Sequence, residues 1–134
     1  LTQAGCRSLP PVPPGGPSAP KEHTFEWEGH SGTAIVWYTV DDQNCTVERI
    51  RCELVGTTSI GVYWAWIECF DGPIVASPCK TPDGKPGIKK CVTTTVVLMN
   101  AVGADIPFVG QVKIRQWEEG RTTITQCTEC CPIE

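Results

Sequence analysis

The sequence predicts an all-β fold: a disulfide-stapled antiparallel β-sandwich of about seven or eight strands, with an immunoglobulin-like or Greek-key arrangement. Three observations predict it. Apolar and polar residues alternate with a period of two in most segments after residue 23, as in half-buried strands. Turn-forming residues separate these segments at short intervals, which is typical of sandwiches and barrels. Nine cysteines in 134 residues indicate disulfides formed in an oxidising compartment.

The first 22 residues are expected to form an extended, proline-rich N-terminal arm. Six of the twelve prolines lie within residues 7–20. Proline fixes φ and removes an amide donor, so this segment favours a polyproline-like conformation. It is either a semi-rigid linker or an arm that docks on its own domain or on a neighbouring copy. Residues 23–134 are then a single β-sandwich domain, which is an ordinary domain size.

Three strands are expected in the first half of the domain. In 24–28, Phe25 and Trp27 alternate with polar residues, which gives one apolar face. Residues 34–40 are almost all β-branched or aromatic, the composition of a buried strand. Within 46–55, apolar and charged side chains alternate from Arg49 to Leu54, which predicts a strand with one solvated face.

A fourth strand is expected at 61–70. It places Trp64 and Trp66 on one face of the sheet, together with Val62. The opposite face carries four further residues: Tyr63, Ala65, Ile67 and Cys69. Because successive side chains of a strand point to opposite faces, one of these two sets faces the core.

The remaining strands are expected at 92–99, 108–117 and 122–127. Charged residues and a glycine at 118–121 predict a hairpin turn between the last two strands. Residues 77–87 carry three prolines and are predicted to be a long loop.

The cysteines divide into two groups. Those within the predicted strands and loops are expected to form structural disulfides: Cys45, Cys52, Cys69, Cys79 and Cys91. The others lie near the ends of the chain and are candidates for a disulfide or an intermolecular thiol: Cys6, Cys127, Cys130 and Cys131. Spacing makes Cys69–Cys79 and Cys79–Cys91 equally plausible pairs. The adjacent Cys130 and Cys131 are expected to reach separate partners, because a ring between neighbours is strained.

An odd number of cysteines leaves one unpaired if the others pair within the chain. In an oxidising compartment the odd thiol is either buried or bonded to another molecule. Cys6 on the arm, or a member of the cluster at 127–131, is best placed to reach outward. Cys127 and Cys130 have the spacing of half a zinc knuckle, but a second close pair would be needed, so no metal site is predicted.

The order Cys52, Trp64, Cys91 loosely follows the Cys–Trp–Cys order of immunoglobulin domains. A tyrosine two residues before the second cysteine would mark that fold, but Lys89 stands there. The comparison therefore supports a sandwich architecture and assigns no family.

No catalytic motif or cofactor-binding motif appears, so we expect a protein without enzymatic activity and without a cofactor. The two histidines, His23 and His30, are predicted to be surface residues near turns. A net charge of −4 gives no reason to expect a nucleic-acid partner. No run of 18 apolar residues is long enough to span a bilayer as a helix.

Two features favour binding. Trp64 and Trp66 can stack on sugar rings if their shared face is exposed, although large aromatic residues in strands belong more often to the core, and few amide or acidic residues neighbour them in sequence. Asn44 begins an Asn-Cys-Thr acceptor pattern for N-linked glycan.

These features support three hypotheses. The first is an extracellular, non-enzymatic structural subunit that assembles with copies of itself into a filament, sheath or surface layer through its arm. The second is a secreted carbohydrate- or protein-binding module. The third is a disulfide-rich inhibitor or effector that acts through residues 77–87.

Overall fold

The computed structural model describes residues 19–56 and 63–133, and it confirms the predicted fold class. The described residues form antiparallel sheets with four disulfides and contain no helix. The strands are β2 (Lys21–Trp27), β3 (His30–Asp41), β4 (Thr46–Val55), β5 (Tyr63–Asp71), β6 (Val75–Lys80), β7 (Pro86–Ile106), β8 (Gly110–Cys127) and β9 (Cys131–Pro132). The arm lies outside the described residues up to residue 18, so its conformation stays a prediction.

One sheet is a meander of β2, β3 and β4. Its first hairpin closes over only two residues, Glu28 and Gly29, because Trp27 pairs directly with His30. Both turn residues have positive φ, 45° and 79°, the backbone conformation of the tight turns that suit the twist of a hairpin. The sheet is thus built entirely from neighbouring segments.

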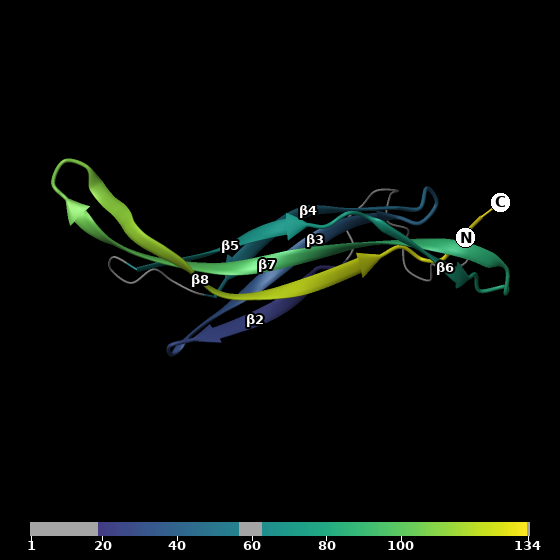
Figure 1. Cartoon of the computed structure of the whole chain (residues 1–134), viewed down its shortest axis with the longest axis horizontal. Coiled ribbons are helices and arrows are strands. Elements are labelled where there is room, and N and C mark those ends of the chain that lie inside the picture. Colours follow the sequence, from purple (N-terminus) through teal and green to yellow (C-terminus); the bar gives the residue numbers. More distant parts are fainter. Residues whose placement is uncertain (1–18, 57–62, 134) are drawn as a thin grey trace.

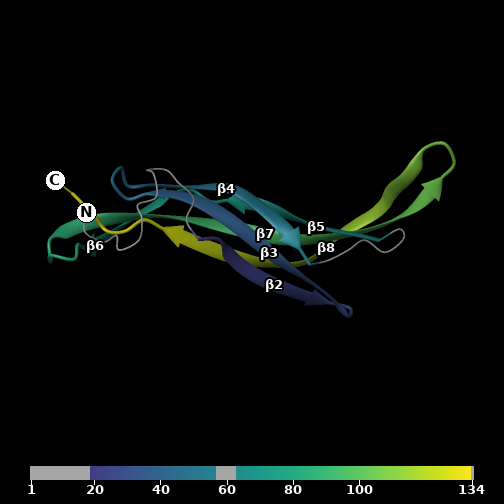
Figure 2. The ribbon, with the colours of Figure 1, turned by 180° about the vertical axis from the view of Figure 1, so that it is seen from behind.

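The other sheet is organised around the 21-residue strand β7. Cys91 pairs with Val75 of β6 on one side and with Cys127 of β8 on the other. β6 and β5 pair one after the other with the same side of β7. β9 and β8 pair with its other side. Figures 1 and 2 show the two sheets stacked as layers, with the strands running along the length of an elongated molecule.

The core lies between the two sheets. Alternate residues of β2, β3 and β4 point inward, and they meet alternate residues of β5, β7 and β8. The buried set is Phe25, Trp27, Ala34, Val36, Tyr38, Val47, Val92, Val96, Leu98 and Ile124. Partly buried residues of β5, Ala65, Ile67 and Cys69, pack against it, so this is the set of that strand that faces the core, and Trp64 and Trp66 lie on the outer face.

The hairpin turn predicted at 118–121 is wrong, because these residues continue β8. Met99 pairs with Glu118 and Leu98 pairs with Gly120, so Glu119 is the extra residue of a β-bulge. Bulges accept the same flexible and polar residues as turns, which explains the error.

The strand ends near this hairpin are also corrected. The segments expected at 92–99 and 108–117 belong to longer strands, and the reversal between them falls at residues 107–109. Phe108, expected at the start of a strand, lies in this turn with a φ of 68°. The amide of Val109 donates to the carbonyl of Ile106 at 3.0 Å, which closes the turn.

The long loop predicted at 77–87 is instead a hairpin between β6 and β7. Its turn is closed by Thr81, whose amide donates to the carbonyl of Lys85 at 2.9 Å. Pro78 lies within β6. A proline is tolerated there because β6 is an edge strand and needs amide donors on one side only.

Candidate functional site

Three of the four disulfides lie at the end of the molecule that carries β6 and β9. Cys91 and Cys127 occupy directly paired positions of β7 and β8. The other two bridges hold the last residues of the chain: Cys79–Cys130 and Cys45–Cys131. Cys130 and Cys131 therefore bond to separate partners, as the sequence predicts.

The fourth disulfide, Cys52–Cys69, joins β4 to β5 and so connects the two sheets. Neither of the pairings suggested by spacing, Cys69–Cys79 or Cys79–Cys91, is formed. The reason lies in the strand register, which sets Cys91 opposite Cys127 and Cys79 opposite Gly87.

Gly87 makes room for one of these bridges. A Cβ atom at this position would lie only 2.7 Å from the Sγ of Cys130.

The cysteines of the described residues all pair with one another. The three C-terminal cysteines, Cys127, Cys130 and Cys131, are therefore not free to bond another molecule. None of the eight is left as a partner for Cys6, which lies outside the described residues. A disulfide-rich extracellular domain is the usual setting for such a set of bridges.

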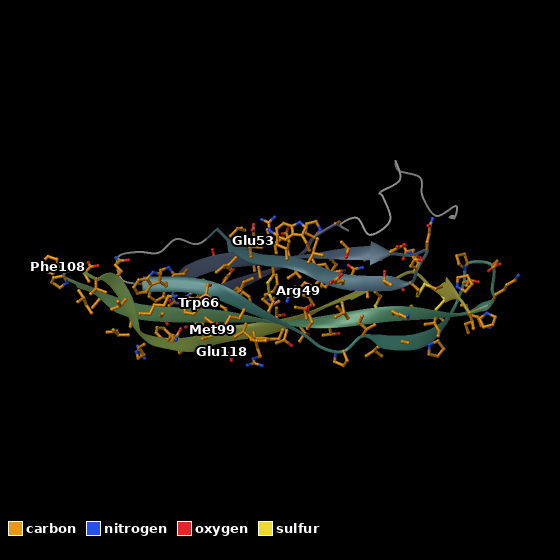
Figure 3. All side chains as sticks on the ribbon, turned by 90° about the horizontal axis from the view of Figure 1, so that it is seen from above. Arg49, Glu53, Trp66, Met99, Phe108 and Glu118 are labelled. Carbon is orange, nitrogen blue, oxygen red and sulfur yellow. A yellow bond between two sulfur atoms is a disulfide. The ribbon has the colours of Figure 1, made fainter. Side chains whose placement is uncertain are left out.

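An aromatic row lies on the outer face of β5 and consists of Trp64, Trp66 and Phe70. The register pairs Trp64 with Ala101 and Trp66 with Met99 of β7. Figure 3 shows Trp66, Met99 and Glu118 in line across the sheet, on three successive strands. The two tryptophans are partly exposed, and Phe70 is 55% exposed.

The rings of the row are held in place by small residues and by charged ones. A Cβ at Gly103 would lie 2.6 Å from Cζ3 of Trp64, so this ring lies directly against the β7 backbone. Nζ of Lys113 lies 4.3 Å from the centroid of the Trp66 ring, and the Nε1 of that ring donates to Glu68 at 3.1 Å. One polar group beside Trp66, the ammonium of Lys113, therefore comes from β8 and not from the residues that neighbour Trp66 in sequence.

An interior polar cluster lies where the turn between β2 and β3 meets β5 and β7. Nε1 of Trp27 donates to the hydroxyl of Tyr63 at 2.9 Å and to Oδ1 of Asn100 at 3.0 Å. The Tyr63 hydroxyl also donates to Oδ1 of Asn100, and the His30 ring stacks on Tyr63 with centroids 5.4 Å apart. Nδ2 of Asn100 has no partner among the described residues.

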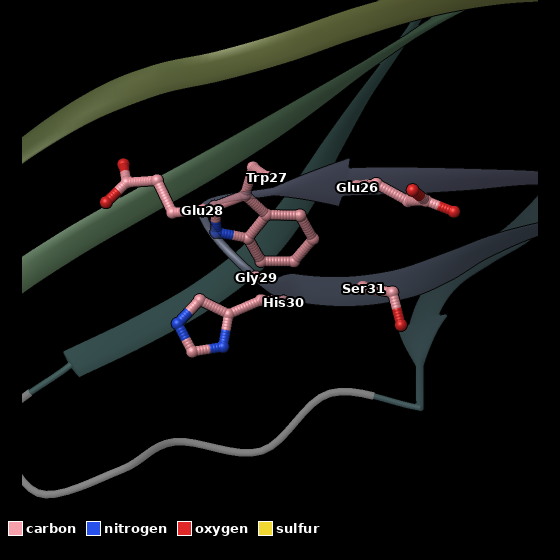
Figure 4. A pocket seen from close by; sticks show the side chains of 6 residues that line it. All are labelled: Glu26, Trp27, Glu28, Gly29, His30 and Ser31. Atoms are coloured by element: carbon pink, nitrogen blue, oxygen red, sulfur yellow. The ribbon is translucent and has the colours of Figure 1, made fainter.

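A shallow pocket of about 500 Å³ lies beside this cluster. It is lined by residues 26–31, and Figure 4 shows the carboxylates of Glu26 and Glu28 on opposite sides of Trp27. The two carboxylates thus do not converge on one point with the imidazole of His30. Sequence reasoning missed this cluster because its members come from β2, β3, β5 and β7.

A second polar chain crosses the core. Tyr38 donates to Oγ1 of Thr94 at 2.8 Å, Thr94 donates to Asp71 at 2.7 Å, and Nε of Arg49 donates to Asp71 at 2.8 Å. Burial raises the pKa of Tyr38. Burial also acts to raise the pKa of Asp71, but the hydrogen bonds from Arg49 and Thr94 outweigh it, so the pKa of this carboxyl is lowered.

The overhanging hairpin, residues 103–114, extends beyond the rest of the sandwich (Figure 1). Within the described residues, β7 pairs with β5 only up to Val102, and from there to Ile106 it pairs with β8 alone. Four apolar side chains of the hairpin are exposed: Ile106 by 43%, Phe108 fully, Val109 by 66% and Ile114 by 66%. Figure 3 places Phe108 at the extreme end of the molecule.

Asn44, the predicted glycan acceptor, lies exposed in the turn between β3 and β4. Its Nδ2 donates to Oδ2 of Asp41 at 2.7 Å. The next residue, Cys45, has a φ of 56° and is anchored to Cys131. Attachment of a glycan stays a prediction.

Comparison with known proteins finds no family model, no curated protein and no solved structure that matches this chain. Within residues 19–56 and 63–133, no three His, Cys, Asp or Glu side chains are grouped so as to hold a metal ion. That same part of the chain has no helix with the length and apolar character needed to cross a membrane. Function must therefore be inferred from the chain's own surfaces.

Proposed function

We propose that this protein is an extracellular structural subunit that assembles end to end with copies of itself. The observation that carries the proposal is the overhanging hairpin with its four exposed apolar side chains. Phe108 stands at the tip, and its contact with water is unfavourable unless something covers it. Large apolar side chains left exposed together on one hairpin favour an interaction surface over an ordinary solvated one.

The opposite end of the molecule offers a different surface. The hairpin of β6 and β7 carries three exposed lysines, Lys80, Lys85 and Lys89, and exposed apolar residues lie nearby at Val75 and Ile133. Figure 1 shows this hairpin at the far end of the long axis from the overhanging hairpin. Two unlike surfaces at opposite ends favour a head-to-tail contact, which propagates into a filament unless rotation closes a ring.

Charge also distinguishes the two ends. The first hairpin, β2–β3, carries exposed carboxylates at Glu22, Glu26 and Glu28. The turn of this hairpin lies toward the overhanging hairpin. Trp27, next to the turn, donates to Tyr63. Tyr63 pairs with Val102, the residue just before the overhanging hairpin. Glu26 and Glu28 beside the β2–β3 turn would attract the three lysines of the β6–β7 hairpin in a head-to-tail arrangement.

The experiment measures association by sedimentation velocity over a range of protein concentrations. Phe108→Ser should weaken association by about 10- to 100-fold, because burying a phenylalanine contributes roughly 1.5–3 kcal/mol. The matched control is Ile50→Ser, which removes a side chain that is 48% exposed in the middle of β4. The proposal fails if the native chain stays monomeric, or if the two variants assemble equally well.

A further inference from the structure

We propose that the aromatic row of one copy binds the proline-rich segment, residues 7–20, of a second copy. This inference rests on the proposed self-assembly and names the contact that the arm makes. It concerns the outer face of β5, whereas the end-to-end contact concerns the overhanging hairpin.

The aromatic row has the form of a platform for an extended ligand. Trp64, Trp66 and Phe70 share one face of one strand, and six residues separate the first from the last. At about 3.3 Å per residue the row is roughly 20 Å long. The Trp64 ring lies against Gly103, and Lys113 and Glu68 hold the Trp66 ring, so little side-chain freedom remains to be lost on binding.

The segment outside the described residues has the matching pattern. Proline occurs at 11, 14, 17 and 20, at every third residue. A polyproline II helix has three residues per turn, so these four prolines would lie along one side of it, with Gly15 and Gly16 between the second and the third. We call this set the proline ridge. Nine steps of about 3.1 Å make the ridge roughly 28 Å long, enough to cover the row.

The chemistry of the two surfaces is complementary. Proline-rich segments in the polyproline II form dock on aromatic side chains in several recognition domains, because the ligand is already extended and loses little entropy. Residues 8–20 contain no charged side chain. They therefore bring no charge that competes with Lys113 or Glu68 for the Trp66 ring.

The position of the arm indicates a second copy and not the same chain. The proline ridge ends at Pro20, and the next residue, Lys21, is fixed opposite Val36 in β3. β2 belongs to the other sheet and contacts β8, whereas β5 contacts β4 at the opposite side of the sandwich. The last turns of the ridge therefore cannot lie along the row of their own chain.

The first experiment uses the full chain and sedimentation velocity. Replacing Pro14 and Pro17 by alanine interrupts the proline ridge and should weaken association by about tenfold, if each lost aromatic contact has its usual strength. Replacing Pro10 and Pro13 removes two prolines from the same segment but outside the ridge, and should have a much smaller effect. Equal effects of the two double variants would refute the ridge.

The second experiment measures binding directly. A labelled synthetic peptide of residues 7–20 is titrated with the Pro14→Ala/Pro17→Ala chain, and its fluorescence anisotropy is recorded. We expect saturable binding that Phe70→Ser weakens. Intrinsic tryptophan fluorescence should respond to the peptide and not to a soluble β-linked oligosaccharide. A response to the oligosaccharide without peptide binding would overturn the inference and make the row a glycan site.

The two proposals fail separately. If Phe108→Ser abolishes assembly while the ridge variant assembles normally and the peptide does not bind, the end-to-end function stands and this inference is wrong. If the chain associates, the peptide binds and the ridge variant weakens association while Phe108→Ser does not, the end-to-end contact is wrong and the contact between arm and row stands. A chain that stays monomeric refutes both proposals.

Discussion

The disulfide between Cys52 and Cys69 should contribute about 3 kcal/mol to the free energy of unfolding. It closes a loop with a sequence separation of 17 residues. No other cysteine lies between the two, so no second bridge shortens that loop in the unfolded chain. The loop-entropy relation gives about 3 kcal/mol for a loop of this length. The bridge also connects the two sheets, whereas Cys91–Cys127 lies within one.

The assay is urea unfolding of the Cys52→Ala/Cys69→Ala double variant, followed by tryptophan fluorescence. We expect a lower midpoint and a loss of about 3 kcal/mol, which corresponds to a fall of roughly 10 °C in the melting temperature for a chain of this size. Cys6→Ser is the control, since no described cysteine is available to pair with it, and it should leave the midpoint unchanged. A loss below about 1 kcal/mol would refute the reasoning from loop length.

Three further outcomes are expected. Gly103→Ala should lower the free energy of unfolding by at least about 2 kcal/mol in the same urea assay, because the new Cβ would overlap the backbone oxygen of Val112 and lie 2.6 Å from the Trp64 ring. An unchanged midpoint would contradict these close contacts. Tyr38→Phe should lower the free energy of unfolding by about 1–2 kcal/mol, because it removes the buried hydrogen bond to Thr94. An unchanged free energy of unfolding would mean that this hydrogen bond does not stabilise the fold. The lowered pKa of Asp71 adds stability above its unfolded pKa near 4, and that stability is lost as the pH falls through the folded value. Asp71→Asn should therefore flatten the acid side of a stability–pH profile, and an unchanged slope would show that the Arg49 contact is not coupled to folding.

The period-two pattern was a good guide to which residues of a strand share a face. It separated Ala65 and Ile67 from Trp64 and Trp66 and left open which set is inward; the structure packs Ala65 and Ile67 against the core. The reason is geometric, since side chains alternate strictly along a strand. The same pattern could not fix strand ends, because a bulge and a turn draw on the same residues, as Glu119 shows.

The cysteine pairing and the exposure of the hairpin depend on parts of the chain that are distant in sequence. Cys79 bonds to Cys130, 51 residues away, because β9 returns to the edge of β7 beside Gly87. Phe108 is exposed because it lies at the end of a hairpin. In that hairpin β7 and β8 continue together beyond Val102, where the pairing of β7 with the described residues of β5 ends. Neither fact is visible in a local window of sequence, since both follow from the lengths of strands that pair only in the folded protein.

The end-to-end contact of the overhanging hairpin and the binding of the arm to the aromatic row should give a higher affinity together than either gives alone. The overhanging hairpin offers only four exposed apolar side chains, and stable protein interfaces bury about 1,200–2,000 Å² in total, far more than such a tip can cover alone. A second contact through the arm, tethered to the same neighbour, would occur at the high effective concentration that a short connection provides. A filament built in this way would weaken sharply when either contact is lost. The Phe108→Ser and Pro14→Ala/Pro17→Ala variants should therefore each reduce assembly, and their combination should abolish it.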